Sequence, residues 1–211
     1  MNIQQFTFNP FQENTYVVYN DEKDALIIDP GCYAEEEEKA LHLFITSNGL
    51  NVKMVVNTHL HIDHTFGNAF VEKTFHVKAS ANAADEFLIK DMDSQARIFG
   101  LTLRNAVTPL GGYLKEGDKI TLGTDSFEIF QIPGHSPGSI VLYSAHNDSI
   151  FVGDVLFQGS IGRTDLQGGN YQSLIEGIQN KLLTLPEKTI VYCGHGPTTT
   201  IGHEKKNNPF L

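Results

Sequence analysis

Cysteine is scarce in this chain, which has two cysteines among its 211 residues. Cys32 and Cys193 lie far apart and match no zinc-binding spacing, so we expect two reduced thiols. The first five residues contain neither a basic start nor an apolar run, and no apolar stretch approaches the roughly 20 residues that cross a bilayer. We therefore expect a cytoplasmic protein that has no membrane partner.

Positive charge is also in short supply. The chain has 15 lysines and arginines against 25 aspartates and glutamates, which gives a net charge of -10 and a pI of about 5.3. This balance argues against a nucleic-acid partner, whose phosphates need a basic face. The length of 211 residues, without a low-complexity linker or a clean repeat, predicts a single domain over residues 1–211, and no protein partner is evident.

The densest group of metal-ligand residues is segment 58–64, where three histidines and one aspartate occur within six residues directly after an apolar run. Imidazoles and carboxylates at the end of a buried strand are poor core residues and good metal ligands. His59 and His61 are two apart and can point the same way, whereas Asp63 and His64 follow around the turn and can face a second metal. The alternative, a cluster of surface histidines, is disfavoured by four candidate ligands in one short segment.

Apolar runs and turn residues predict two β blocks, each followed by helices. The predicted strands lie within residues 2–29 and at 52–56, 119–122, 126–131, 139–144, 149–152 and 189–192. The predicted helices cover residues 35–47, 67–73, 82–99 and 171–184, followed by a short helix and coil over 197–211. This order suggests an α/β fold in which two sheets pack face to face with helices outside.

Three more strand ends carry a candidate ligand beside a glycine, which lets the backbone come close. His135 lies in a turn after strand 126–131, Asp154 follows strand 149–152, and His195 follows strand 189–192. Strand ends of packed sheets gather at one edge, so we expect these side chains to meet segment 58–64 there. Asp29, at another strand end, either supports the metal loop from behind or is a plain turn residue.

The candidate ligands are enough for two metal ions. They divide into two triads and one carboxylate that can bridge them through its two oxygens: His59, His61 and His135; Asp63, His64 and His195; and Asp154. Imidazole with carboxylate suits zinc, iron or manganese, and the ligand set is complete without the Cys193 thiolate. Two such cations can share a water and hold it as hydroxide at neutral pH.

Four motifs resemble the ordered motifs of the metallo-β-lactamase superfamily. They are Thr-His-Leu-His-Ile-Asp-His (58–64), Pro-Gly-His-Ser-Pro-Gly (133–138), Gly-Asp-Val-Leu-Phe (153–157) and Gly-His-Gly-Pro (194–197). The resemblance runs over essentially the whole chain and implies a four-layer αβ/βα sandwich with the metals at the sheet edge. Within the superfamily the chain is similar to the short bacterial form of glyoxalase II, the hydroxyacylglutathione hydrolases, as segments 97–100, 162–165 and 208–211 indicate.

The resemblance implies the same division of ligands, with His59, His61 and His135 on the first metal, Asp63, His64 and His195 on the second, and Asp154 bridging. It implies two divalent ions, zinc first and iron or manganese as alternatives, and a small-molecule thioester such as S-lactoylglutathione as substrate. In the mechanism that follows, a metal-bridging hydroxide attacks the thioester carbonyl and Asp63 also orients the hydroxide.

Two arginines are candidates for substrate binding. Arg97 either faces a pocket or is solvated, and Arg163 either meets an anionic part of the substrate or pins a loop to Asp165. Long glyoxalase II enzymes hold glutathione partly with basic residues of a C-terminal domain, of which this chain offers only Lys205 and Lys206. The physiological thiol is therefore left open.

Several rival functions share the fold. Persulfide dioxygenases use a single iron and also carry a Gly-Arg-Thr-Asp segment, but segment 194–197 and the tail favour the hydrolase. A bridging aspartate at position 154 does not suit a zinc β-lactamase, and a nuclease would need an added domain and a basic surface. A non-catalytic binding module would be expected to lose metal ligands first, whereas all seven candidates are intact here.

Mild acid is expected to abolish activity, because protonated imidazoles cannot bind a metal. The measurement is bound metal and hydrolysis rate on the same samples between neutral pH and about pH 5, where an ordinary imidazole is protonated. Activity and metal content should fall together. Metal retained at the acid end with activity gone would identify another titrating group as the cause.

Overall fold

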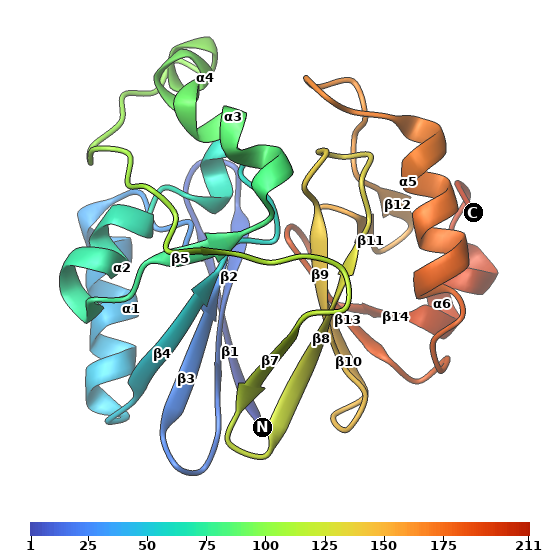
Figure 1. The fold of residues 1–211 in the computed structure, drawn as a ribbon, viewed down its shortest axis with the longest axis horizontal. Helices are drawn as coiled ribbons and strands as arrows, with labels where there is room; N and C mark the ends of the chain where they lie inside the picture. Colours follow the sequence, from blue (N-terminus) through green and yellow to red (C-terminus); the bar gives the residue numbers. More distant parts are fainter.

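The computed structural model describes residues 1–211 and contains two six-stranded β-sheets packed face to face (Figure 1). The first sheet has the order β1-β2-β3-β4-β5-β6 and the second has the order β14-β13-β10-β9-β8-β7. The first-sheet strands are β1 (Asn2–Phe8), β2 (Glu13–Tyr19), β3 (Asp24–Ile28), β4 (Asn51–Val56), β5 (Ala79–Ala81) and β6 (Gly112–Tyr113). The second-sheet strands are β7 (Lys119–Leu122), β8 (Asp125–Gln131), β9 (Ile140–Ser144), β10 (Ser149–Gly153), β13 (Ile190–Cys193) and β14 (Thr199–Thr200). A separate hairpin is formed by β11 (Leu156–Phe157) and β12 (Ser160–Ile161).

Helices cover the outer face of each sheet, which confirms the αβ/βα sandwich predicted from the sequence (Figure 1). The helices are α1 (Glu35–Ser47), α2 (Asn68–Phe75), α3 (Glu86–Lys90), α4 (Met92–Ile98), α5 (Tyr171–Gly177) and α6 (Ile201–Asn207). The first sheet is flanked by α1 and α2, and the second by α5 and α6. The short helices α3 and α4 lie at the upper edge of the first sheet in Figure 1.

The core follows from side chains that alternate across the strands. In β2, Tyr16 and Val18 face the cluster between the two sheets, where they meet Phe127 of β8. Val17 points the other way and packs in the cluster that includes Leu41 of α1. Since successive side chains of a strand point to opposite faces, a strand covered on both sides must be apolar throughout. This explains the near-continuous apolar runs of the inner strands.

Strand direction decides where the strand ends lie. β4 pairs in parallel with β3, and β10 pairs in parallel with β13. β9 is antiparallel to both β8 and β10, so β8 also runs in the direction of β10. The carboxyl ends of β8, β10 and β13 therefore meet at one edge of the second sheet.

The observed elements differ from the predicted ones where local pattern is weak. The helix predicted over 82–99 is divided into a turn of 3₁₀-helix (Ala83–Asp85), α3 and α4, with Asp91 at the break. Aspartate competes for backbone hydrogen bonds and favours such breaks. The helix predicted over 171–184 leaves regular α geometry after Gly177. Four strands of two residues were not predicted, because so short a segment shows no alternation: β6, β11, β12 and β14.

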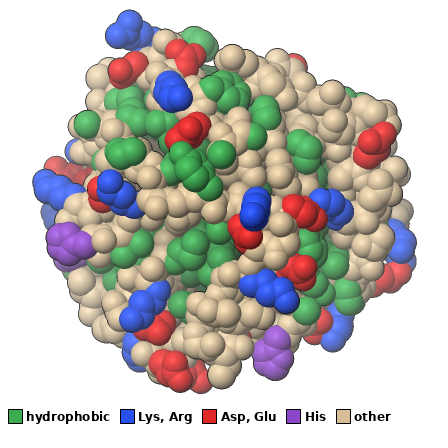
Figure 2. All heavy atoms as spheres, viewed as in Figure 1, with side chains coloured by type: hydrophobic (Ala, Val, Ile, Leu, Met, Phe, Trp, Pro, Cys, Tyr) green, Lys and Arg blue, Asp and Glu red, His purple; other side chains and the backbone are tan.

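The face of the molecule in Figure 2 carries acidic and basic side chains interspersed with one another, with apolar patches between them. Neither sign gathers into a continuous field on this face. None of the helices combines the length and the apolar character needed to cross a membrane.

Candidate metal centre

The candidate ligands from sequence converge at one edge of the two sheets. β4 leads into His59, His61 and a turn of 3₁₀-helix (Ile62–His64), which places the side chains of segment 58–64 over the end of the first sheet. The ends of β8, β10 and β13 supply His135, Asp154 and His195 from the second sheet. The cleft therefore lies where the two sheets meet.

Three imidazoles form the first group of ligand atoms. Nδ1 of His61 lies 2.8 Å from Nε2 of His135, which lies 3.2 Å from Nε2 of His59. His61 thus presents its Nδ1 atom to the group, whereas the other two rings present Nε2. The candidate ligand atoms of the three residues all lie within 4.8 Å of one another.

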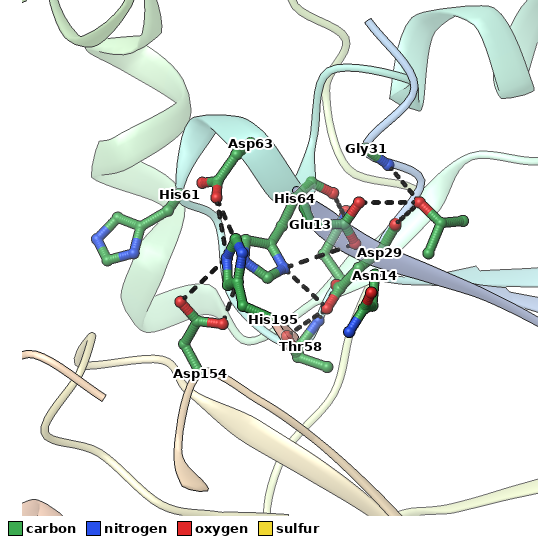
Figure 3. Close-up of polar contacts among 12 residues, drawn as sticks. Glu13, Asn14, Asp29, Gly31, Thr58, His61, Asp63, His64, Asp154 and His195 are labelled. Carbon is green, nitrogen blue, oxygen red and sulfur yellow. Dashed lines mark hydrogen bonds and ion pairs between the residues drawn. The ribbon is translucent and has the colours of Figure 1, made fainter. Parts of the chain in front are cut away.

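The second group combines a carboxylate with two imidazoles. Oδ2 of Asp63 lies 3.2 Å from Nε2 of His195 and 3.7 Å from Nε2 of His64. The candidate ligand atoms of these three residues also lie within 4.8 Å of one another. Their side chains face one another in Figure 3.

Asp154 lies between the two groups. Its Oδ2 atom is 3.6 Å from Nε2 of His135 in the first group and 3.5 Å from Nε2 of His195 in the second. Its Oδ1 atom is 3.4 Å from Nε2 of His64 (Figure 3). A carboxylate in this position has an oxygen available to each side.

The histidines are fixed from behind by their other ring nitrogens. Nδ1 of His135 donates to the carbonyl of Arg163 at 2.8 Å, and Nδ1 of His195 donates to the carbonyl of Phe11 at 3.1 Å. Nδ1 of His64 lies 3.0 Å from Oδ2 of Asp29. With Nδ1 engaged from behind, Nε2 is the ring atom that is left for a metal, which would take the place of any proton there.

Asp29 has the supporting position that was one of its two sequence interpretations. It accepts hydrogen bonds from the backbone N–H of Thr58 at 2.7 Å and from the Thr58 hydroxyl at 2.6 Å (Figure 3). The Thr58 hydroxyl in turn lies 3.1 Å from Nδ1 of His59. One buried carboxylate thereby orients the imidazoles of both His59 and His64.

The two ligand groups differ in the charge of their histidines. Burial and the neighbouring imidazoles lower the pKa of His59 well below its usual value and that of His61 to about 3. Burial also works against the charged forms of His64 and His195, but the nearby carboxylates outweigh it and raise the pKa of both. The pKa values of Asp63 and Asp154 are lowered by the same histidines in spite of burial. The second group therefore pairs protonated imidazoles with ionised carboxylates, and a bound divalent cation would take the place of the imidazole protons.

The donor atoms fit divalent metal ions. Nε2 of His64 and Oδ1 of Asp154 are buried without any hydrogen-bond partner. Buried polar atoms are rarely left unpaired, and those that are need a specific reason. Imidazole and carboxylate donors in this arrangement suit zinc, iron or manganese, so the fold and the histidine-rich groups together imply divalent metals.

Sequence reasoning missed the side chains that hold the His195 loop. Asn14 in β2 donates from Nδ2 to the carbonyls of Cys193 at 3.1 Å and Gly196 at 2.8 Å. Glu13 beside it is fully buried, and its Oε1 atom lies 4.0 Å from Nδ1 of His64. Burial raises the pKa of Glu13 well above its usual value. The available signal was a polar pair opening an otherwise apolar strand.

Cys193 contributes its carbonyl to this loop, and no candidate metal group includes its thiol. The carbonyl also accepts a hydrogen bond from the hydroxyl of Tyr16 at 2.6 Å. Burial raises the pKa of the thiol to about 12, so the sulfur is held in its neutral form.

The two groups open into a cleft of about 380 Å³. Besides candidate ligands, the cleft is lined on its apolar side by Phe11, Leu88, Ile98, Phe99 and Leu166. Arg163 also lines it, but its guanidinium forms two 2.7 Å hydrogen bonds with the carboxylate of Asp165. Arg97 is exposed and is absent from the cleft lining, although its helix α4 contributes other residues.

Comparison with known proteins gives a family match and full-length relatives. Residues 8–195 match a family model described as the metallo-beta-lactamase superfamily. The chain is 42% identical over 212 residues to hydroxyacylglutathione hydrolase GloC of Haemophilus influenzae, covering 100% of this chain and 98% of that protein. It is 39% identical to the solved structure of BLEG-1 B3 metallo-beta-lactamase, with a TM-score of 0.91 and coverage of 100% and 99%. It is 37% identical to TTHA1623 in a di-iron-bound form, with a TM-score of 0.87 and coverage of 99% and 100%.

Gly194→Ala is expected to disrupt the second group. A Cβ atom at this position would lie 2.3 Å from Oδ1 of Asp154 and 2.8 Å from Cε1 of His64, so the His195 loop would have to move. Bound metal per chain should fall, and metal analysis of the purified variant measures the loss. Gly159→Ala is the comparison variant, because its added Cβ would meet nothing within 4 Å, and its positive φ of 68° adds backbone strain without a clash against the ligands. Full metal content in Gly194→Ala would show that this close approach is not required.

Proposed function

Because the chain belongs to the metallo-β-lactamase superfamily, as its motifs predicted, we propose that this metallo-hydrolase cleaves thioesters in the manner of hydroxyacylglutathione hydrolases. One observation carries the proposal. Two ligand groups lie on either side of a shared carboxylate, in a chain related over its full length to a protein of that name.

In this proposal, His59, His61 and His135 hold one divalent cation, Asp63, His64 and His195 hold a second, and Asp154 serves both. Zinc is the first choice for three imidazoles with a shared carboxylate, and iron or manganese suits the mixed group as well. When bound, such cations supply Lewis acidity, which polarises a carbonyl oxygen and makes a coordinated water acidic near neutral pH.

The side chains of the protein then position the reactants. Asp63 lies 3.2 Å from Nε2 of His195 through Oδ2, and its other oxygen can accept a hydrogen bond from the attacking water and aim it at the carbonyl. Asp154 keeps the two groups at a fixed separation. A thiolate is a good leaving group, so the reaction needs no general acid beside the sulfur.

The cleft lining favours a carrier with little charge close to the metals. Phe11, Ile98 and Phe99 give the cleft lining an apolar part, and the rings of Phe11 and Phe99 are in edge contact with centroids 5.1 Å apart. Arg163 is the one lysine or arginine of the lining, and Asp165 already pairs its charge. A carrier with two carboxylates, such as glutathione, therefore finds no free cation in the lining. We expect hydrolysis to depend more on the thioester than on the glutathione moiety.

Two rival activities have a specific observation in their favour. The neighbour BLEG-1 is described as a B3 metallo-beta-lactamase, which makes β-lactam hydrolysis the first rival. The second is oxygen-dependent persulfide chemistry at a single iron, for which His59, His135 and Asp154 would suffice. The two rivals differ from thioester hydrolysis in the substrate cleaved or in the metal content and the need for oxygen. The same purified protein can therefore be tested for each activity.

The deciding experiment is metal quantification followed by assays on one protein preparation. We expect two metal equivalents per chain and hydrolysis of S-lactoylglutathione. S-lactoyl-N-acetylcysteamine, which has the same acyl group without the two glutathione carboxylates, should be cleaved with a kcat/KM within about tenfold of that value. A chromogenic β-lactam and oxygen uptake with glutathione persulfide complete the panel. One iron per chain with oxygen uptake, or a β-lactam preferred over both thioesters, would overturn the proposal.

His135→Ala is expected to lower kcat/KM by orders of magnitude, because its Nε2 atom faces both His61 and Asp154. His146→Ala is the control, since His146 lies outside the cleft lining. Rate and metal content are measured together on both variants. Near-normal hydrolysis with full metal content in His135→Ala would contradict the mechanism.

A further inference from the structure

We propose that Asp85 is a positioning residue that sets the spacing between the two loops of the first metal group. Asp85 is fully buried at the end of the 3₁₀ turn before α3, and it is not one of the candidate ligands. The inference rests on the proposed ligand assignment and adds to it a residue that acts through the ligand loops.

A single carboxylate contacts both loops. Oδ2 of Asp85 accepts hydrogen bonds from the backbone N–H of Leu60 at 3.2 Å and from the hydroxyl of Ser136 at 2.7 Å. Oδ1 accepts from the backbone N–H of Gly138 at 2.6 Å. Leu60 stands between His59 and His61, whereas Ser136 follows His135 directly. The three imidazoles of the first group are therefore tied to each other through Asp85.

The loop around His135 is built to meet this carboxylate. The hydroxyls of Ser136 and Ser139 lie 2.8 Å apart, and the backbone N–H of Ser136 donates to the Ser139 hydroxyl at 3.2 Å. A Cβ atom on Gly138 would lie 2.6 Å from Cγ of Asp85, so the glycine lets the loop approach. These contacts orient the Ser136 hydroxyl and the Gly138 N–H toward one acceptor.

Asp85 holds the outer ends of the two ligand loops, whereas other contacts hold the two sheets together. The backbone N–H of Ile140 donates to the carbonyl of Thr58 at 2.8 Å and joins the same two loops at their bases. The apolar cluster between the sheets, which contains Tyr16 of β2 and Phe127 of β8, also joins them. A variant at position 85 should therefore fold while the separation of His59 and His61 from His135 is relaxed.

Asparagine at position 85 tests this with minimal change of shape. In either orientation of its amide, the NH₂ group faces the backbone N–H of Leu60 or of Gly138, so a donor meets a donor. Supporting groups of this kind typically change metal affinity by about 10–100-fold. We expect that loss for Zn²⁺ at the first group, and little change at the second, in Asp85→Asn. Ser136→Ala, which removes one of the three hydrogen bonds, should show a smaller loss in the same direction.

The experiment titrates full-length, metal-free protein with Zn²⁺ in competition with a chromophoric chelator. His135→Ala and His195→Ala identify which binding step belongs to which group, and thermal unfolding of each metal-free variant records stability. Glu204→Gln is the matched control, because Glu204 is also fully buried and accepts hydrogen bonds from Thr199, Gly159 and Asn208 away from the ligands. It should lower the unfolding temperature and leave both Zn²⁺ steps in place.

The outcomes separate this inference from the proposed function. Unchanged Zn²⁺ binding in Asp85→Asn and Ser136→Ala, with His135→Ala still losing the first step, would overturn the role of Asp85 alone. Equal weakening of both steps in Asp85→Asn and Glu204→Gln would also overturn it, since any buried carboxylate would then suffice. A His135→Ala variant that keeps both steps would remove the ligand assignment itself, and the inference with it.

Discussion

The separation that Asp154 imposes between two groups of imidazoles is the constraint on which the rest of the site depends. Its two oxygens lie within 3.6 Å of ring nitrogens in both groups, so a shift of the β10 end would disturb both at once. β10 is the strand best placed for this role, because it lies inside the second sheet between β9 and β13. Phe151 of the same strand packs in the core between the sheets. The position of the shared carboxylate is thus set by a strand whose five residues are all buried.

So many buried polar groups at one edge are tolerable only if each has a partner. An unpaired buried donor or acceptor costs about 1–3 kcal/mol, and buried charges cost more. The rear nitrogens of His64, His135 and His195 accordingly meet Asp29 and two backbone carbonyls. Among the buried atoms left without a hydrogen-bond partner are Nε2 of His64 and Oδ1 of Asp154, which lie 3.4 Å apart within the ligand cluster. These two atoms fit the divalent metals that the fold and the histidine-rich groups imply.

The ligand residues and the apolar residues of the cleft are held in place by different interactions. The ligand side is held by hydrogen bonds from β2, β3 and the turn before α3, through Asn14, Asp29 and Asp85. The apolar part of the lining comes from side chains on short segments, among which Ile98 is 78% exposed. The hydrogen-bonded ligand residues keep the positions that the chemistry needs. The exposed apolar residues can be substituted with little effect on those positions. This division is consistent with a fold shared by relatives that carry different names.

The sequence by itself determined the fold and the candidate ligands. Ligand residues at strand ends have a local signal, since an apolar run followed by His, Asp and Gly is visible in a few residues, and the motifs led to the superfamily that the comparisons confirm. Asp29 was recognised only as one of two options, and Asp85, Glu13 and Asn14 were missed. Their roles depend on partners 25 or more residues away, as in Asp85 to Leu60, and no local pattern carries that information. The ion pair of Arg163 with Asp165 and the exposed position of Arg97 were likewise decided by tertiary structure. Which of two plausible partners a long side chain meets depends on how its loop packs, and packing is a property of the whole chain.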